Sequence, residues 1–536
     1  MGALPLLASL AITARNEPGG IVAALGKAFT AASTLRALDF GLRQAAISSL
    51  VALLIGLPGA WIVARLDFPG RKILGSLGAV PFCVPPILIV LAFVLYYGRN
   101  GYFNRFLMGL FNLPDPPIGF LYSFWGLVFV HGFYNFPIIL SSVAEVWERL
   151  PQDRDEAARL LGARQFKAFI TGSLPSLAPA IAQASALVFL FSFFSFVVVL
   201  VFGPLGGTTL EVEIFRRARH SGDLSGAAAL GLIETSAALI VVAALALAER
   251  RDSAAIKKAG APLPRNKPLG YERLALISYL AFILIFFVGP IIALIAESLT
   301  VRRGMGGKGV FGFGNFVRLA AAPNSTLIGS VRDTLSIALP AALIATLAGG
   351  LVAFLLTSVS HTDGEEGKAR LGMARTGDNI ALALLSLPLA VSGLVTALGW
   401  SFLGPRAGVG VIIIAEALTA LPFVTRNLMA ALSTLERSPI EAARTLGASS
   451  VKAFLTVQLP AIASGLVTAA AFAFAMAAGD ANAPLLLGKG EFEPLPLLVY
   501  RLVGAYRFPE ACAAGVVLAF LTGLVFFLKD RESLHA

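Results

Sequence analysis

The chain has 536 residues, of which 57% are hydrophobic and 14% are charged, with a net charge of +11 and a mean hydropathy of +0.81. A soluble domain carries roughly 25% charged residues, so this composition excludes a soluble protein and predicts a polytopic helical membrane protein. The positive charge does not indicate nucleic-acid binding, because the basic residues lie mostly between apolar runs, where they orient a membrane protein.

The N-terminal stretch from Met1 to Ala14 is apolar, but it is shorter than the roughly 20 residues that cross a bilayer. It lacks the basic region of a signal peptide, and we interpret it as the end of a first span that begins upstream. Apolar runs of spanning length follow at 44–66, 74–97, 120–143, 176–202, 226–248, 274–296, 334–358, 380–403, 409–432, 461–487 and 511–528. Lipid offers the backbone no hydrogen-bond partners, so these runs predict about 11–12 transmembrane helices.

The segment 249–273 predicts both the orientation and the organisation of the chain. It holds seven lysine and arginine residues, which places it in the cytoplasm by the positive-inside rule. Its prolines Pro262, Pro264 and Pro268 are typical of a linker. We therefore predict a first half at 1–248, a cytoplasmic linker at 249–273 and a second half at 274–536.

The two halves share an internal repeat at an offset of 285 residues. Between Glu156 and Ala178, 14 of 23 positions are identical to their counterparts, and the register continues without a gap from Pro137/Pro422 to Arg216/Arg501. Because the repeats face the same side of the membrane, two homologous helical halves related by an axis along the membrane normal can enclose a pathway.

The repeated cytoplasmic loop has the pattern of two short helices. A helix-forming run ends at a glycine, Gly162 or Gly447, and a second short helix ends at Leu174-Pro175 or Leu459-Pro460. One such loop alone would be typical of an amphipathic segment resting on lipid headgroups. Two loops in the same register favour a surface that two copies of one partner bind.

This loop resembles the EAA signature loop of ABC importer permeases. It has Glu-Ala-Ala, a glycine six residues after the glutamate, and Leu-Pro ending nineteen residues after it. The resemblance implies a type I ABC importer permease-like fold, in the inner membrane of a bacterial cell. It also implies contact with two copies of an ABC ATPase subunit. The ATPase-coupling residues would be Glu156, Ala157, Ala158 and Gly162 in the first loop and Glu441, Ala442, Ala443 and Gly447 in the second.

The chain has no phosphate-binding Gly-x-x-x-x-Gly-Lys-Ser/Thr run, so we predict a transport subunit and not an enzyme. We expect no cofactor, and Cys83 and Cys512 have no metal-ligand spacing. The partners implied by the resemblance are the ATPase, a periplasmic solute-binding protein, a small-molecule solute and the bilayer. An ion-gradient-driven secondary transporter is the alternative of a different class; it would not need two matched cytoplasmic loops. A third hypothesis, a membrane scaffold without transport activity, is not supported by the symmetry of the repeat.

Two further stretches concern the solute. Residues 208–215 are similar to the thiamine permease pattern within the iron(III) and thiamine branch of importer permeases, and so is Gly479-Asp480 followed by 495–501 and 504–507. The resemblance implies thiamine or a thiamine phosphate as the solute. Iron(III) is the alternative, followed by other small solutes such as polyamines.

Ionisable residues within spans are costly and therefore face protein or water. The candidates are His131, Glu234, Glu416 and Asp480, and we single out His131, Glu416 and Asp480 as candidate pathway residues. His131 and Glu416 are equivalent in the repeat, and Asp480 stands where the first half has Ser195. Two carboxylates on the pathway would favour a cation, whereas hydrogen bonding within each half is the structural alternative.

Overall fold

The computed structural model describes residues 4–16, 20–150, 153–203, 207–256, 265–301, 309–321, 326–359, 390–402, 408–433, 435, 437–488 and 492–532. Within these residues ten helices are long and apolar enough to cross a membrane. They cover Ala32–Arg65, Pro86–Phe111, Phe124–Glu148, Phe169–Phe193, Leu224–Ala244, Tyr271–Ser298, Thr326–Leu355, Val409–Leu432, Ala463–Leu487 and Phe508–Val525. The predicted span 380–403 lies partly outside the described residues. Its described part contains the helix α20 (Gly393–Ser401).

The chain packs as two compact units. The N-terminal unit comprises Ile21–Pro81 and Pro86–Phe311, and the C-terminal unit comprises Met1–Gly20, Phe82–Pro85 and Gly312–Ala536. Phe82 belongs to the C-terminal unit because its ring packs edge-on against Phe423 and Phe472, at centroid distances of 5.7 and 5.5 Å. The packing units therefore differ in extent from the halves that the repeat predicts along the sequence.

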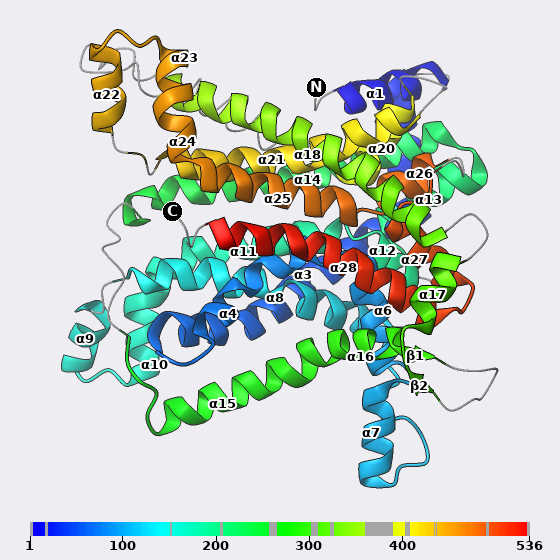
Figure 1. Ribbon diagram of the computed structural model, residues 1–536, viewed down its shortest axis with the longest axis horizontal. Coiled ribbons are helices and arrows are strands. Elements are labelled where there is room, and N and C mark those ends of the chain that lie inside the picture. Colours follow the sequence, from blue (N-terminus) through cyan, green and yellow to red (C-terminus); the bar gives the residue numbers. More distant parts are fainter. Residues whose placement is uncertain are drawn as a thin grey trace. The chain divides into compact units, whose positions relative to one another are not determined.

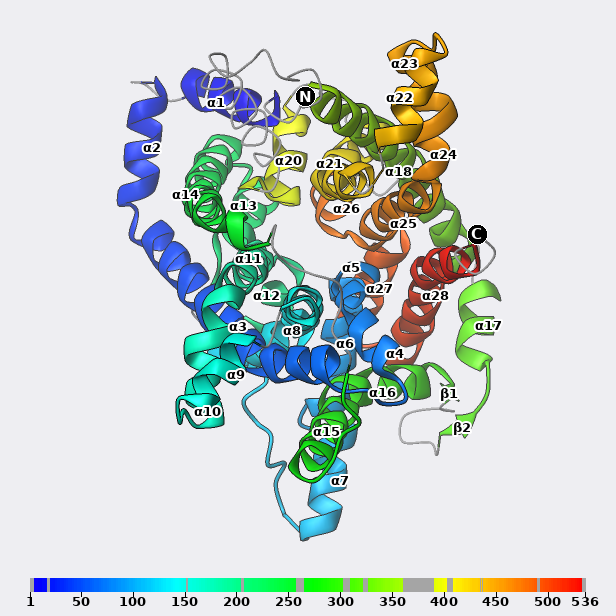
Figure 2. The ribbon, with the colours of Figure 1, turned by 90° about the vertical axis from the view of Figure 1, so that its left-hand side faces the viewer.

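In the N-terminal unit, the helices α3 (Ala32–Arg65), α8 (Phe124–Glu148) and α11 (Leu174–Phe193) pack on one another (Figures 1 and 2). The other helices of this unit are α2 (Gly20–Thr30), α4 (Arg71–Ser76), α6 (Pro86–Tyr97), α7 (Tyr102–Phe111), α9 (Asp153–Leu160), α10 (Gln165–Ala168), α12 (Val197–Phe202), α13 (Leu210–Arg216), α14 (Leu224–Ile256), α15 (Tyr271–Ile283) and α16 (Gly289–Ser298). The short helix α5 (Val80–Cys83) is divided, with its first two residues in this unit and its last two in the C-terminal unit. The strands β1 (Thr300–Val301) and β2 (Val310–Phe311) form a short antiparallel pair.

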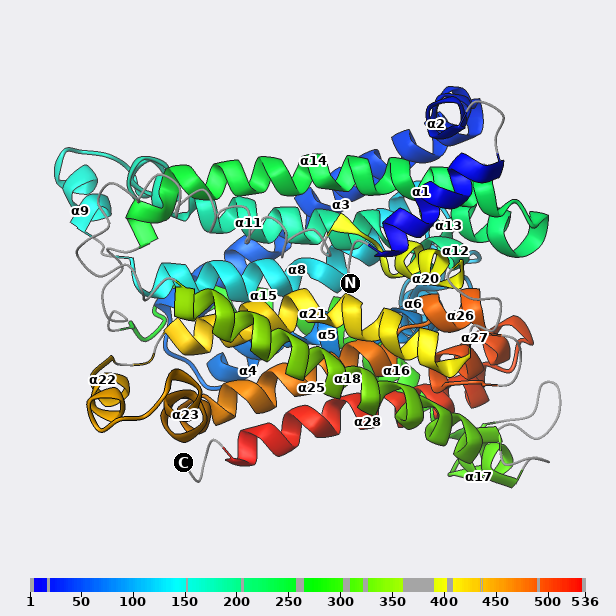
Figure 3. The ribbon, with the colours of Figure 1, turned by 90° about the horizontal axis from the view of Figure 1, so that it is seen from above.

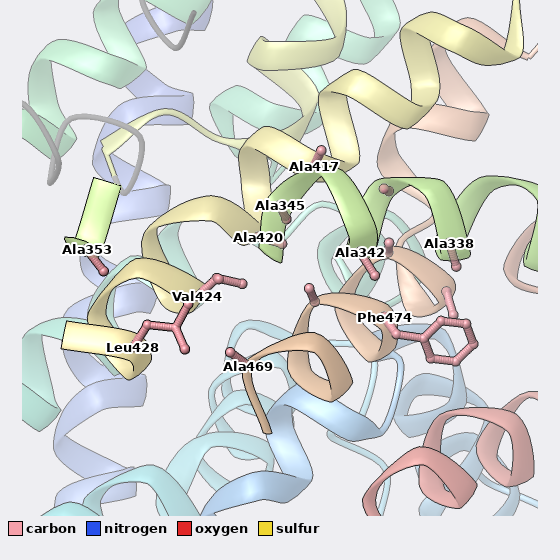
Figure 4. Close-up of a cluster of buried hydrophobic side chains, with 14 of the residues drawn as sticks. Ala338, Ala342, Ala345, Ala353, Ala417, Ala420, Val424, Leu428, Ala469 and Phe474 are labelled. Carbon is pink, nitrogen blue, oxygen red and sulfur yellow. The ribbon is translucent and has the colours of Figure 1, made fainter. Parts of the chain in front are cut away.

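In the C-terminal unit, the helices α18 (Thr326–Val359), α21 (Val409–Ser433) and α25 (Ala463–Gly479) pack together in the same way (Figure 3). The remaining helices are α1 (Leu4–Asn16), α17 (Gly314–Ala321), α22 (Arg437–Thr445), α23 (Ser450–Ala453), α24 (Leu459–Ala461), α26 (Asn482–Leu487), α27 (Leu495–Gly504) and α28 (Phe508–Glu532). The core between α18, α21 and α25 is rich in alanine, including Ala342, Ala345, Ala420 and Ala469 (Figure 4). Small side chains let membrane helices approach closely, which stabilises them by van der Waals contact.

The repeat is visible in the helix boundaries. Shifted by 285 residues, α8 coincides with α21, α10 with α23, and α12 with α26 at both ends. A five-residue π-turn follows α10 at Phe169–Ser173 and follows α23 at Phe454–Gln458. Sequence similarity in the repeat is thus matched by the same local backbone in each unit.

Three predicted spans are not continuous helices, which corrects the sequence-based boundaries. The run 74–97 is broken before Pro86, where Pro85 and Pro86 remove two consecutive backbone donors. The runs 176–202 and 461–487 are each broken before a short helix, α12 or α26. Hydropathy alone cannot detect such breaks, because the residues on both sides are equally apolar.

Candidate functional site

Each repeated loop forms a helical hairpin that begins with a short helix and a glycine turn. In the first hairpin, α9 ends at Leu160, and Gly162 adopts a left-handed φ of 87°. The N–H of Gly162 donates to the carbonyl of Arg159 at 2.9 Å, and that of Ala163 donates to Ala158 at 3.0 Å. These two bonds form a Schellman cap, which satisfies carbonyl groups at the helix end and favours glycine at the left-handed position.

The second hairpin repeats this geometry. Gly447 has a φ of 84°, its N–H donates to Arg444 at 2.9 Å, and the N–H of Ala448 donates to Ala443 at 3.0 Å. A Cβ atom added at Gly162 or Gly447 would meet nothing within 4 Å of the described atoms. The glycine is therefore required by backbone conformation and not by close packing.

The hairpins also expose the same positions. Glu156 and Ala157 are exposed in the first, as are Glu441 and Ala442 in the second, whereas Ala158 and Ala443 are half-buried. A large apolar side chain beside each glycine is almost fully exposed, with Leu161 at 90% and Leu446 at 89%. An exposed leucine beside the turn glycine and an exposed glutamate on the preceding helix are thus repeated in both units.

An aromatic residue anchors each hairpin to its own unit. In the N-terminal unit, Phe169 stacks on Trp147 with ring centroids 5.4 Å apart. In the C-terminal unit, the equivalent Phe454 packs on Phe354 at 4.4 Å. These contacts join each hairpin to the end of α8 or α18.

His131 is buried in α8 and hydrogen-bonded within its unit. Its Nδ1 lies 2.9 Å from Gln44 Oε1, and its Nε2 lies 2.8 Å from Ser195 Oγ. Gln44 Nε2 donates to the carbonyl of Ser192 at 2.6 Å, which orients the amide and makes Oε1 the acceptor for His131. Ser195 Oγ can then donate to Nε2, so each of these polar groups has a partner.

Glu416 and Asp480 form the equivalent pair in the C-terminal unit. Glu416 is buried, and its side chain is hydrogen-bonded to that of Asp480. Asp480 Oδ2 also accepts the N–H of Ala483 at 3.1 Å, so it caps the short helix α26. The structure therefore brings together the two acids that the sequence singled out, and it pairs their counterparts His131 and Ser195 in the same way. Their role in a pathway stays a prediction.

Several polar contacts near the first hairpin were not predicted from the sequence. Glu148 pairs with Arg71 at 2.8 Å and with Arg265 at 2.9 Å. The backbone of Asn266 bonds to that of Arg65 and Asp67, at 3.1 and 2.9 Å. The end of the predicted linker is thus attached to the ends of α3 and α8, at the predicted cytoplasmic face. In the sequence, the charges of Glu148, Arg71 and Arg265 were the only indication that these ion pairs could form.

Comparison with known proteins agrees with this architecture. The sequence profile of the family described as binding-protein-dependent transport system inner membrane component matches residues 19–251 and 369–531. The chain is 26% identical to the thiamine transport system permease protein ThiP of Brucella abortus (strain 2308), over 99% of this chain and 94% of that protein. It is also 26% identical to ThiP of Escherichia coli (strain K12), over 92% and 88%.

Two further matches cover less of the chain. The putative 2-aminoethylphosphonate transport system permease protein PhnU of Salmonella choleraesuis is 29% identical over 34% of this chain and 63% of that protein. A solved bacterial ABC transporter involved in the import of alginate covers 49% of this chain and 94% of its own, with 16% identity and a TM-score of 0.37. The two profile matches together cover most of the chain, and one falls in each repeat. The chain therefore belongs to the binding-protein-dependent transport system inner membrane components, the multi-pass inner-membrane permeases of ABC importers.

Proposed function

We propose that this permease moves thiamine or a thiamine phosphate across the inner membrane, after delivery by a periplasmic binding protein and at the expense of ATP hydrolysed by two separate ATPase subunits. The observation that carries the solute is similarity to thiamine permeases over 99% of the chain. The observation that supports two ATPases is the pair of exposed hairpins with equal caps and equal exposure. Glu156, Glu441 and their neighbouring alanines are the proposed contacts.

The solute can be tested by uptake. Cells that lack their own thiamine importer, and that express this permease with its ATPase and binding protein, should accumulate radiolabelled thiamine. Replacing the phosphate-binding lysine of the ATPase should abolish that uptake, because the permease would lose its energy source. Uptake that persists with the inactive ATPase would support a gradient-driven transporter, and uptake of iron(III) or 2-aminoethylphosphonate in place of thiamine would contradict the proposed solute.

The number of ATPase subunits can be tested by native mass spectrometry of the purified complex. We expect one permease with two ATPase copies, because each hairpin offers the same surface. The Glu156→Lys and Glu441→Lys variants should each favour a complex with one ATPase fewer. A stable wild-type complex with a single ATPase would contradict the assignment of both hairpins.

A further inference from the structure

A cavity of about 630 Å³ lies in the N-terminal unit, beside the first hairpin. It is lined by the ends of α3 and α8, by α9, by the π-turn that follows α10, and by the start of α15; α9 and α15 are labelled in Figure 1. Its volume lies within the range of roughly 300–1,000 Å³ that is usual for small-molecule sites. Because it opens at the predicted cytoplasmic face, its ligand would come from the cytoplasm.

Four aromatic side chains line the cavity beside charged and aliphatic ones. Trp61, Trp147, Phe169 and Tyr271 line it, and the stacked pair Trp147–Phe169 forms one side. Indole and phenol rings stack on flat ligands and attract cations through their negative faces. A flat ligand with a positive charge therefore suits these walls.

Two charged residues in the cavity have incomplete hydrogen bonding. Arg65 Nη2 donates to the carbonyl of Leu150 at 3.3 Å, and Asp155 Oδ2 accepts from Ser173 Oγ at 2.6 Å. Arg65 Nη1 and Asp155 Oδ1 are buried, and neither has a hydrogen-bond partner among the described residues. Burying such groups without a partner costs free energy, so Arg65 Nη1 can donate to a ligand and Asp155 Oδ1 can accept from one.

The hairpin does not need these groups for its own fold. At the positions equivalent to Trp147 and Asp155, the second half has Leu432 and Ile440, yet its hairpin has the same cap and exposure. The cavity side chains are therefore specific to the first half, where the shared coupling architecture does not explain them.

The end of the linker completes the site. Asn266, Tyr271 and Glu272 line the cavity. They are held there by the backbone bonds of Asn266 and by the ion pair between Arg265 and Glu148. A ligand in this cavity would touch the linker and the first hairpin together.

We propose that this cavity binds an aromatic cation that carries a phosphate group. Its rings would stack between the indoles, its amino or cationic part would contact Asp155, and its phosphate oxygens would accept from Arg65. This ligand class rests on the proposed function, because phosphorylated thiamine has this chemistry. Of the two forms, the phosphorylated one can accept a hydrogen bond from Arg65 Nη1, whereas free thiamine leaves that atom without a partner.

The test is equilibrium binding of radiolabelled thiamine diphosphate to the purified full-length permease in nanodiscs without phosphatidylethanolamine. We expect saturable binding, weaker binding of free thiamine, and weaker binding of pyrophosphate alone. The variants Asp155→Asn and Arg65→Gln should each raise Kd about tenfold or more, since each removes a charged hydrogen bond. The control Asp67→Asn changes an exposed carboxylate at the same end of the unit and should leave Kd unchanged.

Two further variants, Asp155→Ile and Trp147→Leu, introduce the residues that the second half has in a hairpin of the same fold. Weaker binding by these variants would therefore reflect lost ligand contacts and not a misfolded hairpin. Absence of saturable binding, or a wild-type Kd in all four variants, would overturn the proposal. So would displacement of the ligand by phosphatidylethanolamine, because the cavity would then hold a lipid headgroup. The assay uses no ATPase and no transport, so its failure leaves the uptake proposal standing, and a failure of uptake leaves a positive binding result standing.

Discussion

Glu441→Lys should abolish solute-stimulated ATP hydrolysis and uptake while the permease still inserts into the membrane. Glu441 is exposed on α22, next to the exposed Ala442 and close to the exposed Leu446. Reversing its charge places a like charge against the partner surface, which costs several kcal/mol and reduces coupling by at least about tenfold. No described intramolecular ion pair of Glu441 is lost, so the fold should be unaffected.

Reconstituted permease with its ATPase and binding protein provides the measurement, with solute-stimulated phosphate release as the readout. Glu156→Lys should have the same kind of effect, because its hairpin has the same cap and exposure. Arg99→Glu, a charge reversal on an exposed residue of the predicted opposite face, is the control and should behave as wild type. Normal stimulation of ATP hydrolysis in both hairpin variants would contradict the assignment of these surfaces as ATPase contacts.

The second large effect concerns the buried acidic pair. We expect Asp480→Ala to lower the thermal stability of the permease in detergent, measured by fluorescence-detected size-exclusion chromatography after heating. The substitution removes the side-chain partner of the buried Glu416 and the cap at Ala483 N. A lost cap costs about 1 kcal/mol and a buried acid without its partner roughly 1–3 kcal/mol, so the two add to a large loss.

A reciprocal exchange separates structure from transport. The double variant Glu416→His with Asp480→Ser introduces the pair found in the N-terminal unit. There, His131 Nε2 and Ser195 Oγ lie 2.8 Å apart. We expect it to recover stability relative to Asp480→Ala. If the acids also assist a cationic solute, thiamine uptake should stay low in this stable variant. Wild-type uptake would show that the pair is purely structural, and failure to recover stability would contradict the equivalence of the two pairs.

Much of the candidate site was predictable because its signals are local. The glycine turn, the flanking helix formers and the Leu-Pro end all lie within about 20 residues, and each acts through its own backbone. The offset of 285 residues predicted matched hairpins, and the structure has them with matched boundaries at α10 and α23. The membrane class followed from apolar runs, since lipid leaves helices as the one available structure for such runs.

Contacts between distant residues were not predictable in this way. Ser195 meets His131, and Arg265 meets Glu148, across 64 and 117 residues, because helices pack side by side and bring unrelated sequence positions together. The cavity beside the first hairpin combines α3, α8, α9 and the end of the linker, which no local pattern connects.

The sequence by itself determined that this chain is a duplicated helical membrane protein with two matched loops, because hydropathy, the repeat and turn chemistry can be read directly along the chain. Only the tertiary structure decided where the apolar runs break, which buried polar groups pair, and which of them lack a partner. The breaks at α12 and α26 depend on side chains that bond to nearby backbone or to other helices, as Asp480 does to Ala483. Whether the helix continues or a side chain bonds to the backbone in its place depends on how the neighbouring helices pack.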